Sequence, residues 1–339
     1  MKHFSKIATA LCAIGLSFSF FGCHTDVDSP APTYYIVTFD TNGGSPASIA
    51  PQTIVHGNTA TKPADPTKEG FASMQWYNGE TIFDFATPIV SDITLTARYF
   101  YFGSKAPTEA KAVGDIVFSD GSATPYSEGL ELTDEKKAAA IAVIFYKGTE
   151  LYNDDDNAET KARTRTLGVG LVHGRSLKWC TDSAGACNTN ITATQCPASG
   201  SSGALEFTGH RNGSDNFTLI GQALGSDDTT TSGAADRYPA FYFARDYKTH
   251  AANVAGTAYE DDWYVPSIAE LFQVWKQITT LNAVGTLCGT DTYGADYYWS
   301  SSQYASHVSR AYVLGFYWGD QNVNYNKSDR RLVCIVREF

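Results

Sequence analysis

Hydrophobic and polar positions alternate with the two-residue period of a β-strand in the first third of the chain. Three segments carry this pattern: YYIVTFD (34–40), TIVHG (53–57) and ITLTARY (93–99). Turn-forming Gly, Asn and Pro residues separate them, and no run with a helical period occurs. The pattern predicts a small β unit over residues 34–100, followed by a linker over residues 101–113.

Residues 114–339 mix the two periods and predict a second, α+β domain. GDIVFSDGSATPY (114–126) is typical of a strand and a turn, whereas LTDEKKAAAIAVIFYKG (132–148) predicts a short helix with an acidic first turn that runs into an apolar strand. Between residues 153 and 235 Asp, Asn, Thr, Ser and Gly dominate, apart from the apolar LGVGL (167–171). We expect loops to prevail there.

The segment DDWYVPSIAELFQVWKQITTLN (261–282) contains the signals of a helix N-terminus. Pro266 and Ser267 open the helix, and Glu270 stands at the capping-box spacing from Ser267. The apolar residues that follow share one helical face, which we expect to be core: Ile268, Leu271, Phe272 and Trp275.

The last segment, 297–339, places polar and aromatic residues between two apolar runs, 310–316 and 332–339, that predict strands. Tyr, Trp, Ser, Asn, His and Arg suit a binding surface, because rings supply contact area at small entropic cost while short polar groups adapt their hydrogen bonds. The alternative is a Tyr- and Asn-rich hairpin whose rings pack on one another. If residues 114–126 and 332–339 close the domain, the strand at 115–118 should pair with the final strand.

The N-terminus has the anatomy of a secretory signal, with Lys2, His3 and Lys6 before an apolar run at 7–21. Phe-Phe-Gly-Cys at 20–23 resembles the lipobox of bacterial lipoproteins, with Phe20 where Leu is usual. The resemblance implies that residues 1–22 are removed, that Cys23 is lipidated, and that residues 23–33 form a tether at a bacterial outer membrane or cell surface. An ordinary cleaved signal is the alternative.

The length of the chain indicates its number of domains, and its charge bears on whether it binds nucleic acid. A chain of 339 residues suggests about two domains. With 36 acidic against 25 basic residues the chain has no basic patch, so nucleic-acid binding is not expected. We expect a monomer, with membrane contact only through the lipid anchor.

Five cysteines remain beyond the anchor, an odd number: Cys180, Cys187, Cys196, Cys288 and Cys334. The first three are close enough in sequence for one local disulfide, although the sequence does not choose the pair. Cys334 lies in an apolar strand and is expected to be core, free or paired with Cys288. The three clustered cysteines lack a nearby His at ligand spacing, so neither a metal site nor any cofactor is expected.

The first domain resembles a known repeat. VTFDTNGG, KPADPTKEGF, QWYNGETIFDF and TPIVSDITLTARY occur in the order found in the Listeria-Bacteroides repeat, a β-grasp-like module of bacterial surface proteins. This resemblance implies a stalk or adhesion spacer in a single copy. Trp76 and Phe71 are then expected to be core aromatics.

GDIVFSDG, DDWYVPSIAELFQVW, YYWSSSQY and NKSDRRLVCIVREF resemble bacterial surface proteins with a C-type-lectin-like fold, which is related to that of formylglycine-generating enzymes. More narrowly, the chain is similar to the treponemal variable protein and its relatives, the targets of diversity-generating retroelements. That resemblance implies a scaffold with long loops and a variable segment at 299–339 that binds a protein or glycan ligand at a host or bacterial surface. The positions implied to be displayed are His307, Ser309, Arg310, Tyr317, Trp318, Asp320, Gln321, Asn322, Asn324, Tyr325, Arg330 and Arg331.

Catalysis is not expected, because no G-x-S-x-G, H-E-x-x-H or Walker motif occurs and Cys288 and Cys334 lack a catalytic context. The alternatives to a display lipoprotein are a structural adhesin whose repeat module makes the contacts, and a catalytic relative of the formylglycine enzymes. The calcium-dependent carbohydrate motif of lectins is missing, so calcium is not required.

Overall fold

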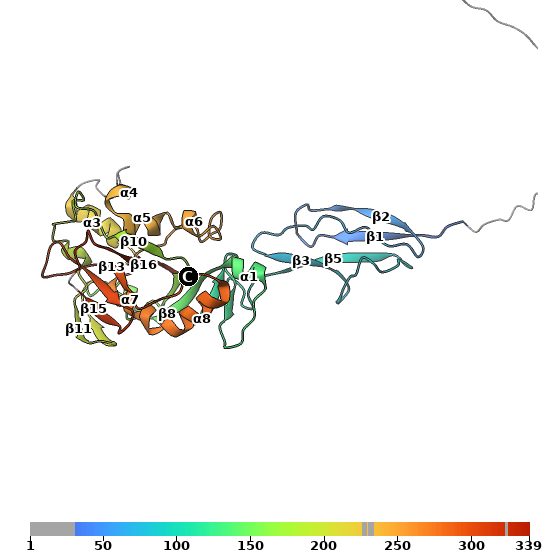
Figure 1. The fold of residues 1–339 in the computed structure, drawn as a ribbon. Helices are drawn as coiled ribbons and strands as arrows, with labels where there is room; N and C mark the ends of the chain where they lie inside the picture. The colour runs from blue at the N-terminus through green and yellow to red at the C-terminus, as the bar shows by residue number, and fades with distance from the viewer. Residues whose placement is uncertain (1–30, 226–228, 230–233, 323–324) are drawn as a thin grey trace, which may run out of the picture.

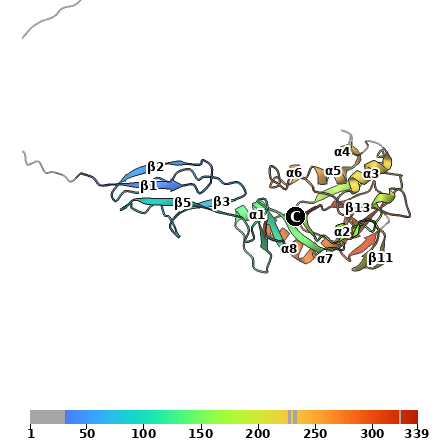
Figure 2. The ribbon, with the colours of Figure 1, turned by 180° about the vertical axis from the view of Figure 1, so that it is seen from behind.

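The computed structural model describes residues 31–225, 229, 234–322 and 325–339. Within these ranges the chain is α+β, with several sheets and more strand than helix. A narrow N-terminal sheet lies at one end, and a larger body follows it (Figures 1 and 2). The expected signal, Cys23 and Asn324 lie outside the described residues, and none of the helices within them is long and apolar enough to span a membrane.

The first domain is a five-stranded sheet in the order β2-β1-β5-β3-β4. Its strands are β1 (Tyr34–Asp40), β2 (Ile49–Val55), β3 (Ser73–Asn78), β4 (Thr81–Ile82) and β5 (Ile93–Phe100). The three predicted strands are confirmed. Strands β1 and β5 pair in parallel, which places Val37 and Leu95 on one buried face. Trp76 is 2% exposed and packs edge-on against Phe39 at 5.3 Å between ring centroids, as expected for a core aromatic.

The segment expected to be a linker, 101–113, is bonded to the second domain. The backbone N–H of Phe102 donates to Asp120 Oδ2 at 2.8 Å, and Lys105 pairs with Ala123 in an antiparallel bridge. Lys105 Nζ also forms a 2.6 Å ion pair with the buried Asp115. Because these contacts are short and partly buried, the second domain holds this end of the segment.

The second domain opens with a five-stranded sheet in the order β17-β9-β8-β6-β7. Its strands are β6 (Asp115–Phe118), β7 (Ala123–Pro125), β8 (Ala140–Gly148), β9 (Arg165–Gly170) and β17 (Val336–Glu338). The predicted helix is α1 (Asp134–Ala139), and its N-cap Thr133 accepts from the N–H of Lys136 before the chain enters β8. The apolar β8 lies at the centre because both of its faces are buried.

The predicted pairing of the 115–118 strand with the final strand is wrong. Both belong to the same sheet, but β8 and β9 lie between them. The final segment is not one strand either, because it divides at Cys334 and Ile335: β16 (Arg330–Val333) joins another sheet, and only β17 pairs with β9. The hydrogen bonds between Tyr264 and Val336 hold β17 in place.

The other large sheet has the order β10-β16-β13-β14-β15. Its remaining strands are β10 (Gly174–Lys178), β13 (Tyr297–Gln303), β14 (Ala311–Gly315) and β15 (Asp320–Asn322). A separate hairpin joins β11 (Ala198–Ser201) to β12 (Ala204–Phe207). The expectation that loops prevail over 153–235 is therefore wrong in part. Besides the excepted apolar run at 167–171, the strands β10, β11 and β12 fall there: β10 pairs with the distant β16, and β11 pairs locally with β12.

Helices cover the two large sheets. The described helices are α2 (Ala158–Lys161), η1 (Thr192–Thr194), α3 (Asn216–Leu224), α4 (Ala234–Arg237), α5 (Pro239–Arg245), α6 (Tyr247–His250), α7 (Ile268–Lys276) and α8 (Ile278–Cys288). The capping box at the start of α7 is confirmed. Of the predicted core face, Ile268, Leu271 and Phe272 are buried, and Trp275 is partly buried.

A buried ion pair joins α7 to the first sheet of this domain. Arg165 Nη1 lies 3.0 Å from Glu270 Oε1, and both side chains are at most 1% exposed. Tyr264 OH accepts from Arg165 Nη2 at 2.9 Å and donates to Glu270 at 3.0 Å. Glu338 on β17 also accepts from Arg165, at 3.1 Å. Each of these polar groups has a hydrogen-bond partner within the cluster, and the bonds fix the positions of α7, β9 and β17 relative to one another.

Candidate binding face

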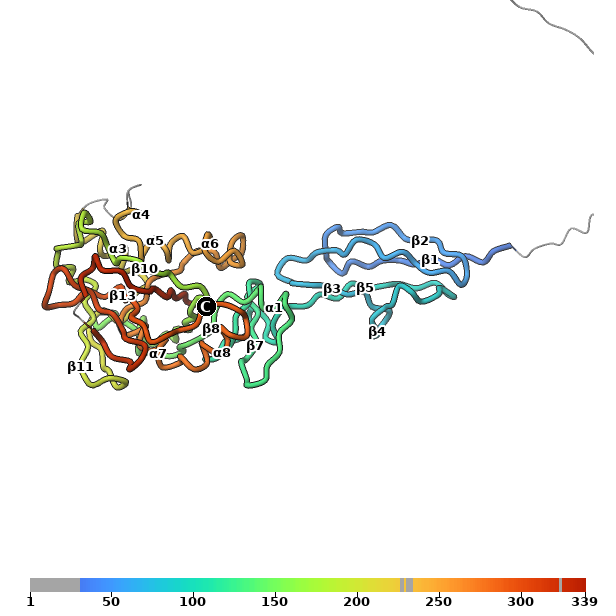
Figure 3. The backbone as a smooth tube through the Cα atoms, in the orientation of Figure 1, coloured from blue at the N-terminus to red at the C-terminus, as the bar shows by residue number. Residues whose placement is uncertain are grey.

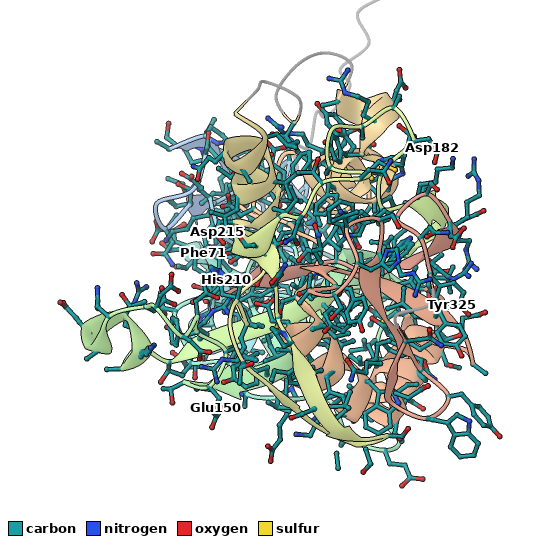
Figure 4. All side chains as sticks on the ribbon, turned by 90° about the vertical axis from the view of Figure 1, so that its left-hand side faces the viewer. Phe71, Glu150, Asp182, His210, Asp215 and Tyr325 are labelled. Carbon is teal, nitrogen blue, oxygen red and sulfur yellow. The ribbon has the colours of Figure 1, made fainter. Side chains whose placement is uncertain are left out.

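The strands that carry the predicted displayed residues lie at the end of the second domain remote from the repeat module. Labels β11, β13 and β15 mark this end in Figure 1, and Figure 3 shows β11 and β13 there. The N-terminus of the described chain lies beyond the module, at the opposite end. Figure 4 views the molecule from the remote end and shows Tyr325 on the same side as Asp182.

The start of the predicted variable segment is a buried floor. Trp299, Ser300, Ser301 and Ser302 of β13 are all 0% exposed. Trp299 Nε1 donates to Leu177 O at 3.0 Å, Ser300 Oγ donates to Tyr312 O at 2.9 Å, and Ser302 Oγ accepts from the N–H of Ile268 at 3.0 Å. Because the serine hydroxyls bond to backbone groups, β13 is fixed to β14 and to α7. Ala311 and Val313 of β14 are buried as well.

The β14–β15 turn presents two large aromatic rings to solvent. Tyr317 is 63% exposed and Trp318 is 65% exposed, and their rings meet edge-on at 4.3 Å between centroids. Gly319 follows in the left-handed region with φ +63°, and a Cβ there would lie 2.5 Å from the Trp275 ring. Only glycine fits this approach, so Trp275 supports the turn from below while the two rings point outward.

The β11–β12 hairpin adjoins this turn. The N–H of Gly203 donates to Gly319 O at 3.0 Å, and Gln321 Nε2 donates to Ala198 O at 3.3 Å. Asp320, Gln321 and Asn322 of β15 are each half-buried. The hairpin therefore forms a wall beside the exposed rings, although nothing in its polar sequence suggested this role.

A second group of predicted residues surrounds Tyr325. Its ring lies 5.2 Å from that of Tyr297, and the guanidinium carbon of Arg331 lies 3.7 Å from its centroid, which is a cation–π contact. Arg330 is anchored separately, because its Nη1 donates to Ser176 O at 2.6 Å. Tyr325 is thus half-buried and held in place from two sides.

The loop that joins β13 to β14 contacts the segment at 325–329. Arg310 and Asn326 form an antiparallel bridge, and the N–H of Lys327 donates to Ser309 O at 2.9 Å. Ser309 Oγ also lies 3.3 Å from His307 Nδ1. His307 is exposed, whereas Ser309 and Arg310 are half-buried. These bonds join the β13–β14 loop to the segment at 325–329, although the β14–β15 hairpin separates the two in sequence.

The two groups adjoin through Tyr297. Its ring contacts Tyr325 on one side, and it pairs in register with Gly315, whose own partner in β15 is Asp320. None of the predicted residues within the described ranges is buried. The surface they form, here called the remote face, combines exposed Tyr and Trp rings with Arg, Asp, Gln and Asn side chains.

Lys327 is the supporting residue that sequence reasoning missed. It is fully buried, and its ammonium donates to Ala186 O at 2.6 Å and to Gln303 Oε1 at 2.9 Å. The ammonium also lies 4.9 Å from the centroid of the Trp179 ring. Burial lowers the pKa of Lys327 to about 8. Its sequence context, Asn-Lys-Ser-Asp, is typical of a solvated loop and gave no signal of this role.

The described residues show no group of three or more His, Cys, Asp or Glu side chains that could hold a metal ion. Cys334 is fully buried, and burial raises the pKa of its thiol to about 12. His173 is also buried between Tyr293 and Tyr298, which lowers its pKa to about 4. These groups are packed as core.

Comparisons with known proteins identify the first domain. Residues 35–98 match the Listeria-Bacteroides repeat domain, so the predicted module is present in the chain. A relative from Evansella cellulosilytica, named as a candidate membrane protein, is 39% identical over 69 residues. The match covers 19% of this chain and 10% of the relative, so the chain spans about a tenth of that relative's length.

A comparison with solved structures aligns most of the chain. The crystal structure of a fimbrial protein from Bacteroides ovatus aligns with 91% of this chain and 71% of that chain, at 13% identity and a TM-score of 0.48. The resemblance of residues 114–339 to C-type-lectin-like variable proteins stays a prediction.

Proposed function

We propose that this protein is an adhesive surface protein of bacteria, in which the repeat module is a spacer and the remote face of the second domain binds a protein or glycan ligand. Cys23 would carry the lipid anchor at the outer membrane or cell surface. With the anchor at the N-terminus and the face at the other end of the molecule, the described length of the chain would separate ligand from membrane.

The exposure of Tyr317 and Trp318 is the observation that carries this proposal. A soluble protein gains nothing in stability from two adjacent rings that are both more than half exposed. Such rings are the commonest energetic centres of binding surfaces, particularly when polar groups surround them. Here Asp320 and Gln321 follow directly in β15, and the buried β13 beneath makes the support rigid.

A second candidate function is adhesion through the repeat module. Tyr34 and Ile36 of β1 are about half exposed, and so is Ile82 of the edge strand β4. These side chains offer an apolar surface of their own. This alternative assigns the second domain a structural role.

A binding assay separates the two functions. Beads coated with the full chain would be applied to intact epithelial cells, to bacterial cells and to a glycan array. The remote-face function predicts that Tyr317→Ser together with Trp318→Ser reduces retention at least tenfold, because each displayed ring contributes ~2 kcal/mol or more to a contact. The matched control is Tyr34→Ser together with Ile36→Ser in the module. If only the control reduces retention, the module is the adhesive part; if neither does, the remote-face proposal is wrong.

We further propose that the remote face is diversified, as in the treponemal variable protein. The distribution of exposure supports this: the residues expected to vary are exposed or half-buried, while Trp299, Ala311 and Val313 are buried framework. Substitution on the face would then leave the floor unchanged. The test is in the flanking DNA, where a near-copy of the codons for 299–339 should differ from them at adenines and should lie beside a reverse transcriptase gene. A locus that lacks both the near-copy and the reverse transcriptase gene would contradict diversification. Ligand binding by the remote face would still be tested by the bead assay.

A further inference from the structure

Two cysteines lie against the buried end of Lys327. Cys180 follows β10 and Trp179, and it is 0% exposed, while Cys187 is 6% exposed. Two successive turns join them, closed by N–H donation from Ala184 to Thr181 O and from Cys187 to Ala184 O, each at 3.0 Å. Asp182, between them, keeps its side chain 77% exposed, and Figure 4 shows it at the surface on the side of Tyr325.

Lys327 contacts both ends of this turn. The N–H of Cys180 donates to Lys327 O at 3.0 Å, and Lys327 Nζ donates to the carbonyl of Ala186, the neighbour of Cys187. Cys180 and Cys187 lie in the same buried cluster, and the Cys187 thiol contributes, after burial, to the raised pKa of the Cys180 thiol. Two buried cysteines at the ends of so short a turn are the candidates for a disulfide bond.

The other cysteines have different surroundings. Cys196 packs in the second core cluster of the domain, close to Ala269 and Glu270, whereas Cys180 and Cys187 share the first cluster. Cys334 also packs in the second cluster, and Cys288 lies at the end of α8. Among the described cysteines the fold thus singles out one pair.

We propose that Cys180 and Cys187 form a disulfide bond in the exported protein and that this bond fixes the floor beneath the 325–329 segment. One sulfur–sulfur bond forms as each thiol loses its hydrogen. The two electrons and two protons pass to the oxidant, a low-molecular-weight or protein disulfide of the extracytoplasmic space, which becomes two thiols. The inference rests on export for its oxidant but not on any ligand of the remote face.

The order of events follows from burial. Exchange requires a thiolate, and burial raises the pKa of the Cys180 thiol, so the folded reduced protein contains little of the reactive form. The bond therefore forms while the turn is still open, during folding after export. A chain folded under reducing conditions should be slow to oxidise, whereas one refolded in an oxidising buffer should acquire the bond.

Peptide mapping tests the proposal on the full chain. The protein would be unfolded, refolded in a mixture of reduced and oxidised glutathione, trapped with N-ethylmaleimide in denaturant and digested without reductant. Endoproteinase Asp-N cuts before Asp182, between the two cysteines, and thermolysin cuts before Ile191, between Cys187 and Cys196. We expect a linked peptide pair that contains Cys180 and Cys187 and is two hydrogens lighter than the sum of its parts.

Cysteine variants and a reductant serve as controls for the disulfide mapping. Cys196→Ala should keep the linked pair, and Cys187→Ala should abolish it without creating a link to Cys196. For the wild type, reductant should lower the melting temperature by several degrees, and it should not lower that of the Cys180→Ala, Cys187→Ala variant. Recovery of maleimide on both Cys180 and Cys187 of the refolded wild type, or a link from either to Cys196, would overturn the proposal.

Discussion

Lys327 Nζ lies 2.9 Å from Gln303 Oε1, and both side chains are fully buried. Gln303 ends β13, the framework strand, whereas Lys327 belongs to the segment that carries Tyr325. Gln303 Oε1 also accepts from the N–H of Ile191 at 2.9 Å. Gln303 Oε1 therefore links three parts of the fold: the buried strand β13, the segment that carries Tyr325, and the chain at Ile191 that follows the 180–187 turn.

The buried Lys327 predicts a pH dependence of stability. Its pKa falls from the ordinary 10.5 to about 8 on folding, so between these values the unfolded chain binds more protons than the folded one. The contribution of Lys327 to the unfolding free energy should therefore rise with pH in this window, by up to roughly 3 kcal/mol. Buried thiols such as Cys180 and Cys334, whose pKa values are raised by burial, contribute with the opposite sign. The Lys327 contribution is therefore measured as the difference between wild type and Lys327→Met in urea unfolding at pH 7.5, 8.5 and 9.5, and this difference should grow with pH. The exposed Lys276→Met is the control, and its difference from wild type should not grow with pH.

The exposed rings should contribute little to stability. Tyr317→Ser and Trp318→Ser should each change the unfolding free energy by about 0.5 kcal/mol or less, because surface truncations remove few contacts. Tyr325→Ser should cost more, about 1 to 2 kcal/mol, since Tyr325 packs on Tyr297 and beneath Arg331. Thermal melts followed by circular dichroism measure all three. A double Tyr317, Trp318 variant that fails to fold would show that these rings are core, contrary to their exposure.

The buried ion pair predicts a large effect of removing one partner. Arg165→Met should destabilise the second domain by about 3 to 5 kcal/mol, because it leaves the Glu270 carboxylate in the core without its cation. Glu338→Gln is the matched control, since this carboxylate contacts the same guanidinium but is 45% exposed, and its loss should cost less than about 1 kcal/mol. Equal effects of the two substitutions in denaturant titrations would contradict this assignment.

The C-terminus should be structural. Phe339 stacks on Tyr259 at 5.6 Å between ring centroids, and its N–H donates to Thr166 O at 2.9 Å. Deletion of residues 337–339 removes this ring and most of β17, so the melting temperature of the whole domain should fall by several degrees. Removal of residues 31–33 is the comparison and should have no such effect. A truncated protein with an unchanged near-ultraviolet spectrum and melt would mean that β17 is dispensable.

The anchor predicts a change of phase behaviour. Cys23→Ser should move the full chain from the detergent phase to the aqueous phase in Triton X-114 partitioning, because acyl chains account for its membrane affinity. Partitioning that stays in the detergent phase, with the apolar run at 7–21 still attached, would instead indicate a membrane-spanning segment.

Local features were predictable because they depend on neighbours in the chain. The alternation in residues 34–40 and 93–99 identified strands of the repeat module, and Ser267 with Glu270 identified the start of α7. Each signal needs only a few consecutive residues, whose spacing decides which side chains share a face or reach a backbone N–H. The exposure of Tyr317 and Trp318 was implied by the resemblance to the variable proteins.

Long-range partners decided the rest. The apolar run at 332–339 was expected to be one strand, yet its first half pairs with β10 and its end with β9, because two sheets compete for its hydrogen bonds. Lys327 was indistinguishable in sequence from a solvated lysine until acceptors from residues 186 and 303 surrounded it. The sequence by itself determined the elements and the kind of surface. The tertiary structure alone decided the pairing of the strands, the buried cation and the shared burial of Cys180 and Cys187, since these depend on packing against residues distant in the chain.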